Sequence, residues 1–158
     1  MIWPMSVRSF ASIDELRLAV GQEVATTQWH TVTQQQINTF ADATGDQQWI
    51  HIDVARASVE SPYKSTIAHG FLTLSLLSEL SREAVEIQEP FRHRINYGIN
   101  RLRFPAAVRA GVRVRGRFTL KAVEDVENGV QVVWDCRVEI ENEPKPALVA
   151  EWLTRLYR

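Results

Sequence analysis

The hydrophobic pattern of this chain changes from helical to alternating near its middle. From His69 the run H-G-F-L-T-L-S-L-L-S-E-L is apolar on most of its faces, and only Thr73, Ser75 and Ser78 interrupt it. So few polar positions are typical of a helix that other structure covers on several sides. The run therefore predicts a long core helix.

Beyond Pro90 the pattern takes a period of two, which predicts antiparallel strands. A final strand is predicted over residues 147–157. Apolar or small residues alternate with polar ones in two further segments, at Val112, Val114, Gly116, Phe118 and Leu120, and then at Val130, Val132, Trp134, Cys136, Val138 and Ile140.

Residues 127–129 (E-N-G) separate these two segments and predict a three-residue hairpin loop with Gly129 in the left-handed conformation. The resulting register pairs opposite charges: Arg117 with Glu139, Arg115 with Glu141, and Lys121 with Asp135. A shift by two residues would put Arg117 beside Arg137, so the complementary register is preferred.

The first half of the chain predicts shorter elements. Residues 13–20 predict a short helix and residues 23–31 a strand. Thr33 and Gln36 form a capping box that starts a second helix, which Gly45 is placed to end. Residues 46–67 predict a long ordered loop, with one short helix that Asp53 would cap.

Together these elements predict a two-layer α+β arrangement, in which an antiparallel sheet curls around the central helix. No linker, repeat or low-complexity tract divides the 158 residues, so we expect a single domain over residues 13–158 behind a flexible arm at residues 1–12. A domain of this size buries roughly 68 to 70% of the surface that its unfolded chain exposes, which allows a substantial core.

The amino-acid composition limits the kinds of partner that the protein is expected to bind. The 18 basic and 19 acidic residues nearly cancel, which argues against nucleic acid or an anionic membrane surface. We expect neither a signal peptide nor a membrane span, because no apolar run is long enough for either. Cys136 is the single cysteine and is interpreted as a small core residue. The reducing cytoplasm is the expected compartment.

Residues 40–51 (F-A-D-A-T-G-D-Q-Q-W-I-H) place an aspartate and a histidine on one predicted loop. A bent loop would let Asp46 and His51 share one water as general acid and base, whereas an extended loop would hold them about 15 Å apart. Structural roles are the alternatives. Asp46 could form an Asx turn after Gly45, and His51 could be a half-buried residue bonded to backbone.

Gly70 stands where the predicted core helix begins, so its backbone N–H is free to bind a developing oxyanion. Close helix packing is the alternative reason for a glycine there. The neighbouring His69 is interpreted as structural. No further cluster of ligand residues is apparent in the sequence, so no metal site is expected.

Two motifs resemble the signature of MaoC-like dehydratases and (R)-specific enoyl-thioester hydratases: Gly45-Asp46-x-x-x-Ile50-His51 and Ala68-His69-Gly70-x-Leu72. These families belong to the hot-dog-fold superfamily. Across residues 21–158 the chain is similar to the branch named after nodulation protein N, including I-N-Y-G at 95–98 and R-F-P at 103–105.

The resemblance implies a hot-dog fold, a catalytic dyad of Asp46 and His51, and an oxyanion hole to which the Gly70 N–H contributes. The implied reaction hydrates a trans-2-enoyl thioester to an (R)-3-hydroxyacyl thioester, or runs in reverse. It needs no metal or redox cofactor, and coenzyme A or a carrier protein is part of the substrate. The resemblance also implies a homodimer or higher homo-oligomer, which would cover an exposed strand edge.

Four further residues are expected to bind substrate. Many family members have Asn-Pro where this chain has Gln48-Trp49, and Trp49 is expected to line or cover the acyl site. Phe71 is expected to contact the acyl group as well. Arg101 and Arg103 are candidates for the phosphates of coenzyme A or of a carrier arm, whereas the arginines at 113, 115 and 117 are interpreted as a solvated sheet face.

Two other functions stay open. A hot-dog thioesterase would direct water at the thioester carbonyl and could use Glu79 on the core helix. A non-catalytic acyl-CoA-binding or signalling protein would fit the nodulation-related resemblance and the change at Gln48-Trp49.

Overall fold

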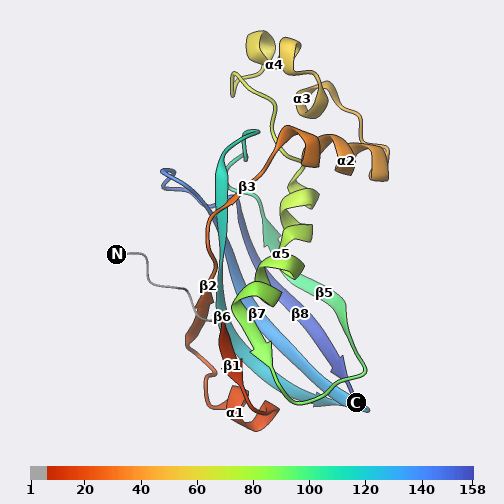
Figure 1. The fold of residues 1–158 in the computed structure, drawn as a ribbon, viewed down its shortest axis with the longest axis vertical. Helices are drawn as coiled ribbons and strands as arrows, with labels where there is room; N and C mark the ends of the chain where they lie inside the picture. Colours follow the sequence, from red (N-terminus) through yellow and green to blue (C-terminus); the bar gives the residue numbers. More distant parts are fainter. Residues whose placement is uncertain (1–6) are drawn as a thin grey trace.

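The computed structural model describes residues 7–158, in which a curved sheet packs against one side of a long helix, α5 (Gly70–Ala84) (Figure 1). Three further helices lie beyond the N-terminal end of α5, at the top of Figure 1: α2 (Gln34–Thr44), α3 (Trp49–Ile52) and α4 (Val54–Glu60). The other elements are β1 (Arg8–Phe10), α1 (Ile13–Arg17), β2 (Glu23–Thr26), β3 (His30–Thr31), β4 (Val85–Ile87), β5 (His93–Arg103), β6 (Arg113–Val126), β7 (Gly129–Ile140) and β8 (Leu148–Tyr157).

The main sheet is antiparallel throughout, with the strand order β2-β6-β7-β8-β5, and β3 also pairs with β6. This arrangement confirms the predicted α+β class and the four antiparallel strands after the core helix. A second, parallel pair joins β1 to β4, at the C-terminal end of α5. Arg8–Phe10 lie within the segment expected to be a flexible arm, and this pairing holds them on the domain; residues 1–6 lie outside the described part.

The helix α5 packs on the concave side of the sheet, where it contributes to a single hydrophobic core. Each fully buried leucine of that core stabilises the fold by about 1.5 to 3 kcal/mol. The opposite side of α5 is open: Phe71 is 66% exposed, and Ser75 and Glu79 are exposed as well. The prediction that structure covers this helix on several sides is therefore wrong for the single chain. The buried residues of α5 are Leu72, Thr73, Leu77, Leu80 and Ala84.

Local signals fixed the second helix as predicted. The Thr33 side chain accepts a hydrogen bond from the Gln36 N–H at 3.1 Å, and Gly45 ends α2 with a left-handed φ of 77°. Asp53 caps α4 by accepting from the Arg56 N–H at 3.0 Å. The segment predicted as a loop also contains α3, so His51 lies on a helical turn rather than in a loop.

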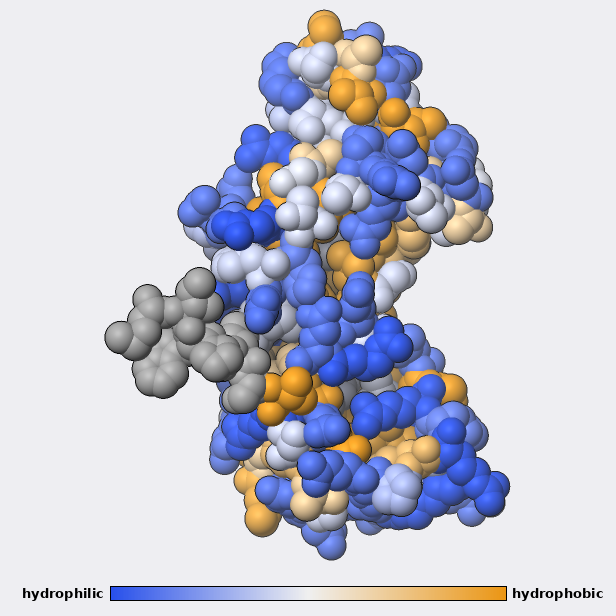
Figure 2. Space-filling view, in the orientation of Figure 1, coloured by the Kyte–Doolittle hydropathy of each residue, from blue (hydrophilic) through white to orange (hydrophobic). Residues whose placement is uncertain are grey.

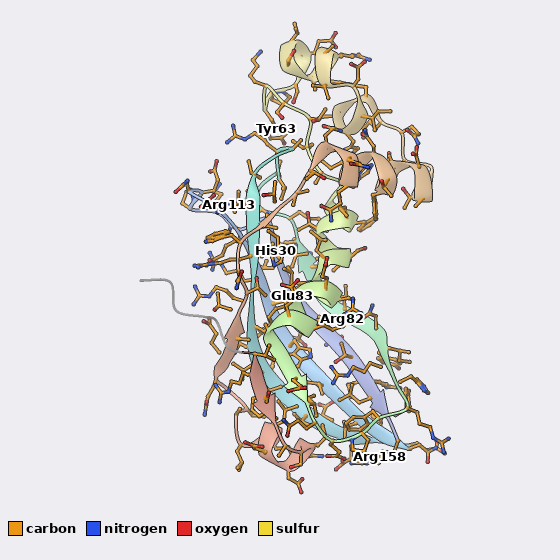
Figure 3. The ribbon with its side chains drawn as sticks, in the orientation of Figure 1. His30, Tyr63, Arg82, Glu83, Arg113 and Arg158 are labelled. Carbon is orange, nitrogen blue, oxygen red and sulfur yellow. The ribbon has the colours of Figure 1, made fainter. Side chains whose placement is uncertain are left out.

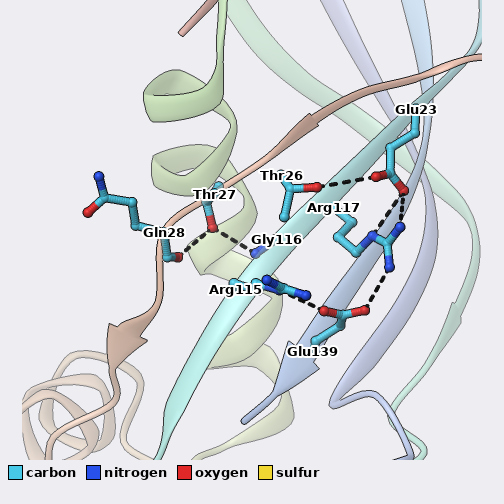
Figure 4. Close-up of polar contacts among 8 residues, drawn as sticks. All are labelled: Glu23, Thr26, Thr27, Gln28, Arg115, Gly116, Arg117 and Glu139. Atoms are coloured by element: carbon cyan, nitrogen blue, oxygen red, sulfur yellow. Dashed lines mark hydrogen bonds and ion pairs between the residues drawn. The ribbon is translucent and has the colours of Figure 1, made fainter. Parts of the chain in front are cut away.

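The strand predicted over residues 23–31 is interrupted. Thr27 is buried, and its side-chain oxygen accepts the Gly116 N–H at 2.9 Å and donates to the Gln28 carbonyl at 2.8 Å (Figure 4). A hydroxyl thus replaces a backbone acceptor of the neighbouring strand, which separates β2 from β3. The helix predicted over residues 13–20 is also shorter, because α1 ends at Arg17.

The predicted hairpin register is wrong. The turn between β6 and β7 leaves only Glu127 and Asn128 unpaired, and the register shifts at Lys121, so that Arg117 lies opposite Arg137. Arg117 avoids the like charge by forming ion pairs with Glu139 at 3.0 Å and with Glu23 of β2 at 2.7 Å (Figure 4). Exposed pairs contribute only about 0 to 1 kcal/mol, so they do not select the register.

Cys136 is a buried core residue, as predicted, and burial raises the pKa of its thiol. Among the described residues, no helix is long and apolar enough to cross a membrane. Hydrophilic side chains cover most of the face shown in Figure 2, with small groups of hydrophobic ones at its upper end and in its lower half. Val54 and Val59 of α4 are exposed.

Candidate active site

The site lies where α2, α3 and the start of α5 meet. Gly45 reverses the chain at the end of α2, and Asp46 follows directly with an exposed side chain. The Asp46 carboxylate accepts from the Gln48 N–H at 3.4 Å, which is a long hydrogen bond. An Asx turn is therefore weakly formed, and the carboxylate remains free to make other contacts.

His51 is buried, and its Nδ1 lies 2.7 Å from the backbone oxygen of Ile67. A carbonyl can only accept, so Nδ1 carries the proton, and in the neutral ring Nε2 keeps its lone pair. One ring nitrogen of His51 thus bonds to backbone, as the structural alternative predicted, and the other nitrogen remains available for acid/base chemistry.

Two neighbouring segments hold the helical turn α3 in place. Gln34, the first residue of α2, donates through Nε2 to the His51 carbonyl at 2.7 Å. The Thr66 hydroxyl donates to the same Gln34 side chain, and the Ile67 N–H donates to the Ile50 carbonyl at 3.1 Å. These bonds connect α3 to both α2 and the segment that leads into α5.

His69 occupies the N-cap position of α5 and is 4% exposed. Its ring stacks on the His51 ring, with centroids 3.8 Å apart and planes 24° apart. One nitrogen from each ring and one Asp46 carboxylate oxygen all lie within 4.8 Å of one another. One water can bridge groups this close, since two hydrogen bonds of about 2.6 to 3.2 Å each reach across about 5 Å.

Gly70 is the first residue of α5, and within residues 7–158 its N–H and that of Phe71 have no hydrogen-bond acceptor. A Cβ at Gly70 would lie 3.0 Å from the Phe104 ring, so a side chain there would crowd the ring. The free N–H groups therefore begin one residue after His69, at the positive end of the helix dipole.

Asp46, His51 and His69 are residue types that bind metals, but their geometry does not suit one ion. Ring lone pairs lie in the ring plane, so nearly parallel stacked rings direct them side by side rather than toward a common point about 2.0 to 2.1 Å from each nitrogen. The Nε2 of His69 also lies 3.0 Å from the Asp46 carbonyl and is engaged there. The arrangement fits proton transfer better than metal binding.

The structure does not gather all the predicted substrate-binding residues around this cluster. Phe71 lies on the first turn of α5, edge-to-face with Phe104 at 6.2 Å. The Trp49 ring packs beneath the Arg56 guanidinium, whose Cζ lies 4.3 Å from the centroid of the Trp49 ring. Arg101 and Arg103 border a groove on the outer face of the sheet, opposite α5, together with Lys121, Arg137 and Glu151.

His69 is the residue whose place the sequence did not reveal. The interpretation of His69 as structural stays a prediction, and the structure adds that its ring contacts both members of the predicted dyad. Its position directly before Gly70 was the available signal, because an N-cap side chain lies beside the first free N–H groups of its helix.

A family model described as the MaoC like domain matches residues 15–141. The chain belongs to the MaoC-like dehydratase family. It is accordingly an enzyme of the hydro-lyase class. The matched range contains Asp46, His51, His69 and Gly70, so the whole cluster lies within the family's domain.

Two curated relatives are similar along most of their length. The chain is 47% identical over 150 residues to 3-hydroxyacyl-thioester dehydratase Z of Mycobacterium tuberculosis (strain ATCC 25618 / H37Rv), covering 94% of this chain and 98% of the relative. It is 46% identical over 143 residues to Nodulation protein N of Rhizobium meliloti (strain 1021), covering 90% and 89%.

The fold is similar to that of solved hydratases. The (R)-hydratase from A. caviae involved in PHA biosynthesis matches with a TM-score of 0.66 and 23% identity, over 85% of this chain and 94% of the other. This likeness confirms the predicted hot-dog fold.

Proposed function

We propose that this MaoC-like dehydratase adds water to a trans-2-enoyl-CoA to give an (R)-3-hydroxyacyl-CoA, or catalyses the reverse. The observation that carries the proposal is the grouping of the Asp46 carboxylate with a His51 ring nitrogen within 4.8 Å, beside the Gly70 N–H, which has no acceptor among residues 7–158. The relative named a 3-hydroxyacyl-thioester dehydratase and the structural neighbour named an (R)-hydratase support the same reaction.

The proposed reaction divides the water between two carbons. A water held by Asp46 and His51 attacks C3 and gives one proton to this pair, while C2 gains a proton from the pair, so that one water is added with no net change in charge. Positioned acid and base groups of this kind contribute about 10²- to 10⁴-fold to the rate.

Negative charge develops on the thioester oxygen during this step. The Gly70 N–H has no other acceptor within the described chain and stands at the positive end of the α5 dipole. We assign it to the oxyanion hole, where a single donor contributes about 10²- to 10³-fold. The absent side chain lets the thioester approach this N–H.

Two adjoining cavities along α5 offer room for the acyl chain. The first, of about 240 Å³, lies between α5 and β5 and is bordered by Leu74 and Ile99. The second, of about 250 Å³, continues toward the end of α5 and shares Ser78, Asn96 and Trp152 with the first. Arg82 borders the second cavity from the side of α5 that faces β5 (Figure 3).

We propose that the acyl chain runs along these cavities from the dyad, with Phe71 at the start. Ser78 stands eight residues after Gly70, which is about 12 Å along the helix axis at about 1.5 Å per residue. At about 1.2 Å per bond, a chain of about ten carbons beyond C3 spans this distance. The part of Trp49 in substrate binding stays a prediction, because its described contact is with Arg56.

Arg101 and Arg103 are proposed to bind the phosphates of coenzyme A. Both border the outer groove, and neither they nor Arg137, which borders it too, form an ion pair within residues 7–158. Arginine suits phosphate because its planar guanidinium donates two parallel hydrogen bonds. The same groove would accept the phosphate of a carrier-protein arm. One buried cysteine fits the proposed location in the cytoplasm.

We also propose that two copies pair through β5. This strand ends the main sheet, so one of its edges has no partner strand within the described chain. Ile95, Tyr97 and Ile99 along it are 42%, 52% and 37% exposed, and the open side of α5 lies next to it. A long apolar edge is a liability unless another strand covers it.

The rival functions gain less from the structure. Glu79, which a thioesterase could use, lies on α5 nine residues after Gly70, about 13 Å along the helix from the free N–H. A binding protein would not need the unprotonated His51 nitrogen that the Ile67 carbonyl enforces.

Replacing either member of the dyad is expected to abolish most of the activity. Wild-type protein should remove the enoyl absorbance of crotonyl-CoA without releasing thiol. Asp46→Asn and His51→Ala should each lower kcat at least about 100-fold while the protein stays folded, because each removes a proton acceptor. Thiol release would indicate a thioesterase, and binding of acyl-CoA without turnover at any chain length would indicate a binding protein.

The Gly70 N–H is tested by comparing two substitutions. Gly70→Ala keeps the N–H but adds a Cβ against Phe104, whereas Gly70→Pro adds similar bulk and removes the donor. Proline is tolerated at the first position of a helix. We expect kcat for crotonyl-CoA to be about 100-fold lower in Gly70→Pro than in Gly70→Ala. Equal rates in the two folded variants would remove this N–H from the mechanism.

The acyl path predicts an effect of chain length. Ser78→Leu should lower kcat/KM for trans-2-tetradecenoyl-CoA, which has about eleven carbons beyond C3, about tenfold or more by filling the shared part of the cavities, and should change kcat/KM for crotonyl-CoA less than about twofold. Glu79→Leu adds the same side chain at the next position, outside both cavities, and serves as the matched control. An equal loss for both substrates would argue against this path.

The proposed dimer is tested by light scattering after size exclusion. Wild-type protein should elute at twice its chain mass of 18.1 kDa, and Ile95→Lys should shift it toward the monomer, because a charge on an edge strand opposes pairing. Val59→Lys, at a 71% exposed residue of α4, should leave the mass unchanged. A monomeric wild-type enzyme at micromolar concentration would contradict the pairing.

A further inference from the structure

We propose that His69 is a positioning residue, which holds Asp46 and His51 in the arrangement that shares one water. The inference rests on the proposed function, since it assigns a third residue to the same site. His69 does not need to touch the substrate for this role. It acts through one hydrogen bond and one ring stack, which can be tested separately.

The hydrogen bond fixes the loop that carries Asp46. The His69 Nε2 lies 3.0 Å from the Asp46 backbone oxygen, and it must donate because a carbonyl only accepts. The Asp46 side chain is 55% exposed and its own hydrogen bond to Gln48 is long. The bond from His69 is therefore shorter than the hydrogen bonds of Asp46 to Thr44 and Gln48, which are both 3.4 Å long.

The ring stack fixes the plane of His51. The His69 ring lies between two others, stacked on His51 at 3.8 Å and tilted against Phe40 at 5.0 Å. The Ile67 carbonyl already fixes one edge of the His51 ring, through Nδ1. With an edge bonded and a face covered, the direction of the His51 Nε2 lone pair is determined.

Burial makes the histidine a rigid support. His69 is 4% exposed, and its Nδ1 has no hydrogen-bond partner within residues 7–158. An unpaired buried nitrogen costs stability, and a purely structural site could avoid this cost with an aromatic hydrocarbon ring. A histidine combines, in one small ring, an aromatic face for His51 with an N–H donor for Asp46.

His69 also connects these two residues to the oxyanion donor. It is the N-cap of α5, so the chain passes from its backbone directly to Gly70. The loop after α2, the turn α3 and the start of α5 thus meet at one side chain. Displacement of a catalytic group by about 1 Å can lower the rate about 100-fold. Holding these three segments in place through His69 therefore affects the rate of the proposed reaction.

Two variants of His69 separate its two contacts. His69→Phe keeps an aromatic ring and loses the N–H, whereas His69→Gln keeps a terminal N–H at a similar distance and loses the ring. With crotonyl-CoA, we expect kcat to fall about 10- to 100-fold in His69→Phe with KM within about threefold of wild type. His69→Gln should recover at least part of kcat, because it can still restrain Asp46.

The same assay contains its controls. His30→Phe makes the identical change at a histidine of β3. The His30 side chain pairs with Glu83 near the other end of α5 (Figure 3), so kcat of this variant should stay within about twofold of wild type. Melting temperatures of all variants are compared, and rates are measured below the lowest of them. If His69→Phe does not fold, His69→Asn replaces it, because its shorter amide cannot reach the Asp46 carbonyl.

Wild-type kcat in His69→Phe would overturn the proposal. So would a loss of kcat in His69→Gln equal to that in His69→Phe, or in His69→Asn where that variant replaces it, because the N–H would then have no separate role. Failure of the proposed function looks different, since wild-type protein itself would then leave crotonyl-CoA unchanged.

Discussion

The hydrogen bond between His51 Nδ1 and the carbonyl of Ile67 is the constraint on which the site depends. It places the ring proton on Nδ1, so that Nε2 keeps the lone pair that acid/base chemistry requires. The Ile67 backbone can serve as this acceptor because its own N–H is bonded to Ile50 and the next residue bonds to Val108. A rigid segment before α5 therefore sets the chemistry of a side chain on α3.

The same segment leads into α5, which connects the site to the proposed substrate path. α5 begins immediately after it, so the Gly70 N–H stands next to the buried histidines. Beyond this point α5 passes along β5 and leaves the two adjoining cavities between them. The long helix thus supplies the oxyanion donor at its start and one wall of the proposed acyl path along its length.

Much of this could be predicted from local sequence. Thr33 and Gly45 delimit α2 through contacts within a few residues, and the apolar run after His69 is a strong helix signal. The two sequence motifs that contain Asp46 and His69 also indicated a common site. They lie apart in the sequence, and the resemblance to a known family assigned both of them to one site.

The rest depends on contacts between distant segments. The break between β2 and β3 arises from Thr27 and Gly116, and the hairpin register arises from the turn and a bulge at Lys121 rather than from charge pairs. The stacking of His69 on His51 could not be seen in the sequence for the same reason, since it requires α3 to fold back onto the N-cap of α5. Neither interaction has a local signature.

The central claim is that Asp46 and His51 act as one unit on a single water. Comparing kcat for crotonyl-CoA in Asp46→Asn, in His51→Ala and in the double variant tests it most directly. If the two residues share one water, the double variant should be about as slow as the slower single variant. Losses that multiply in the double variant would show that the residues act independently, and would contradict the account.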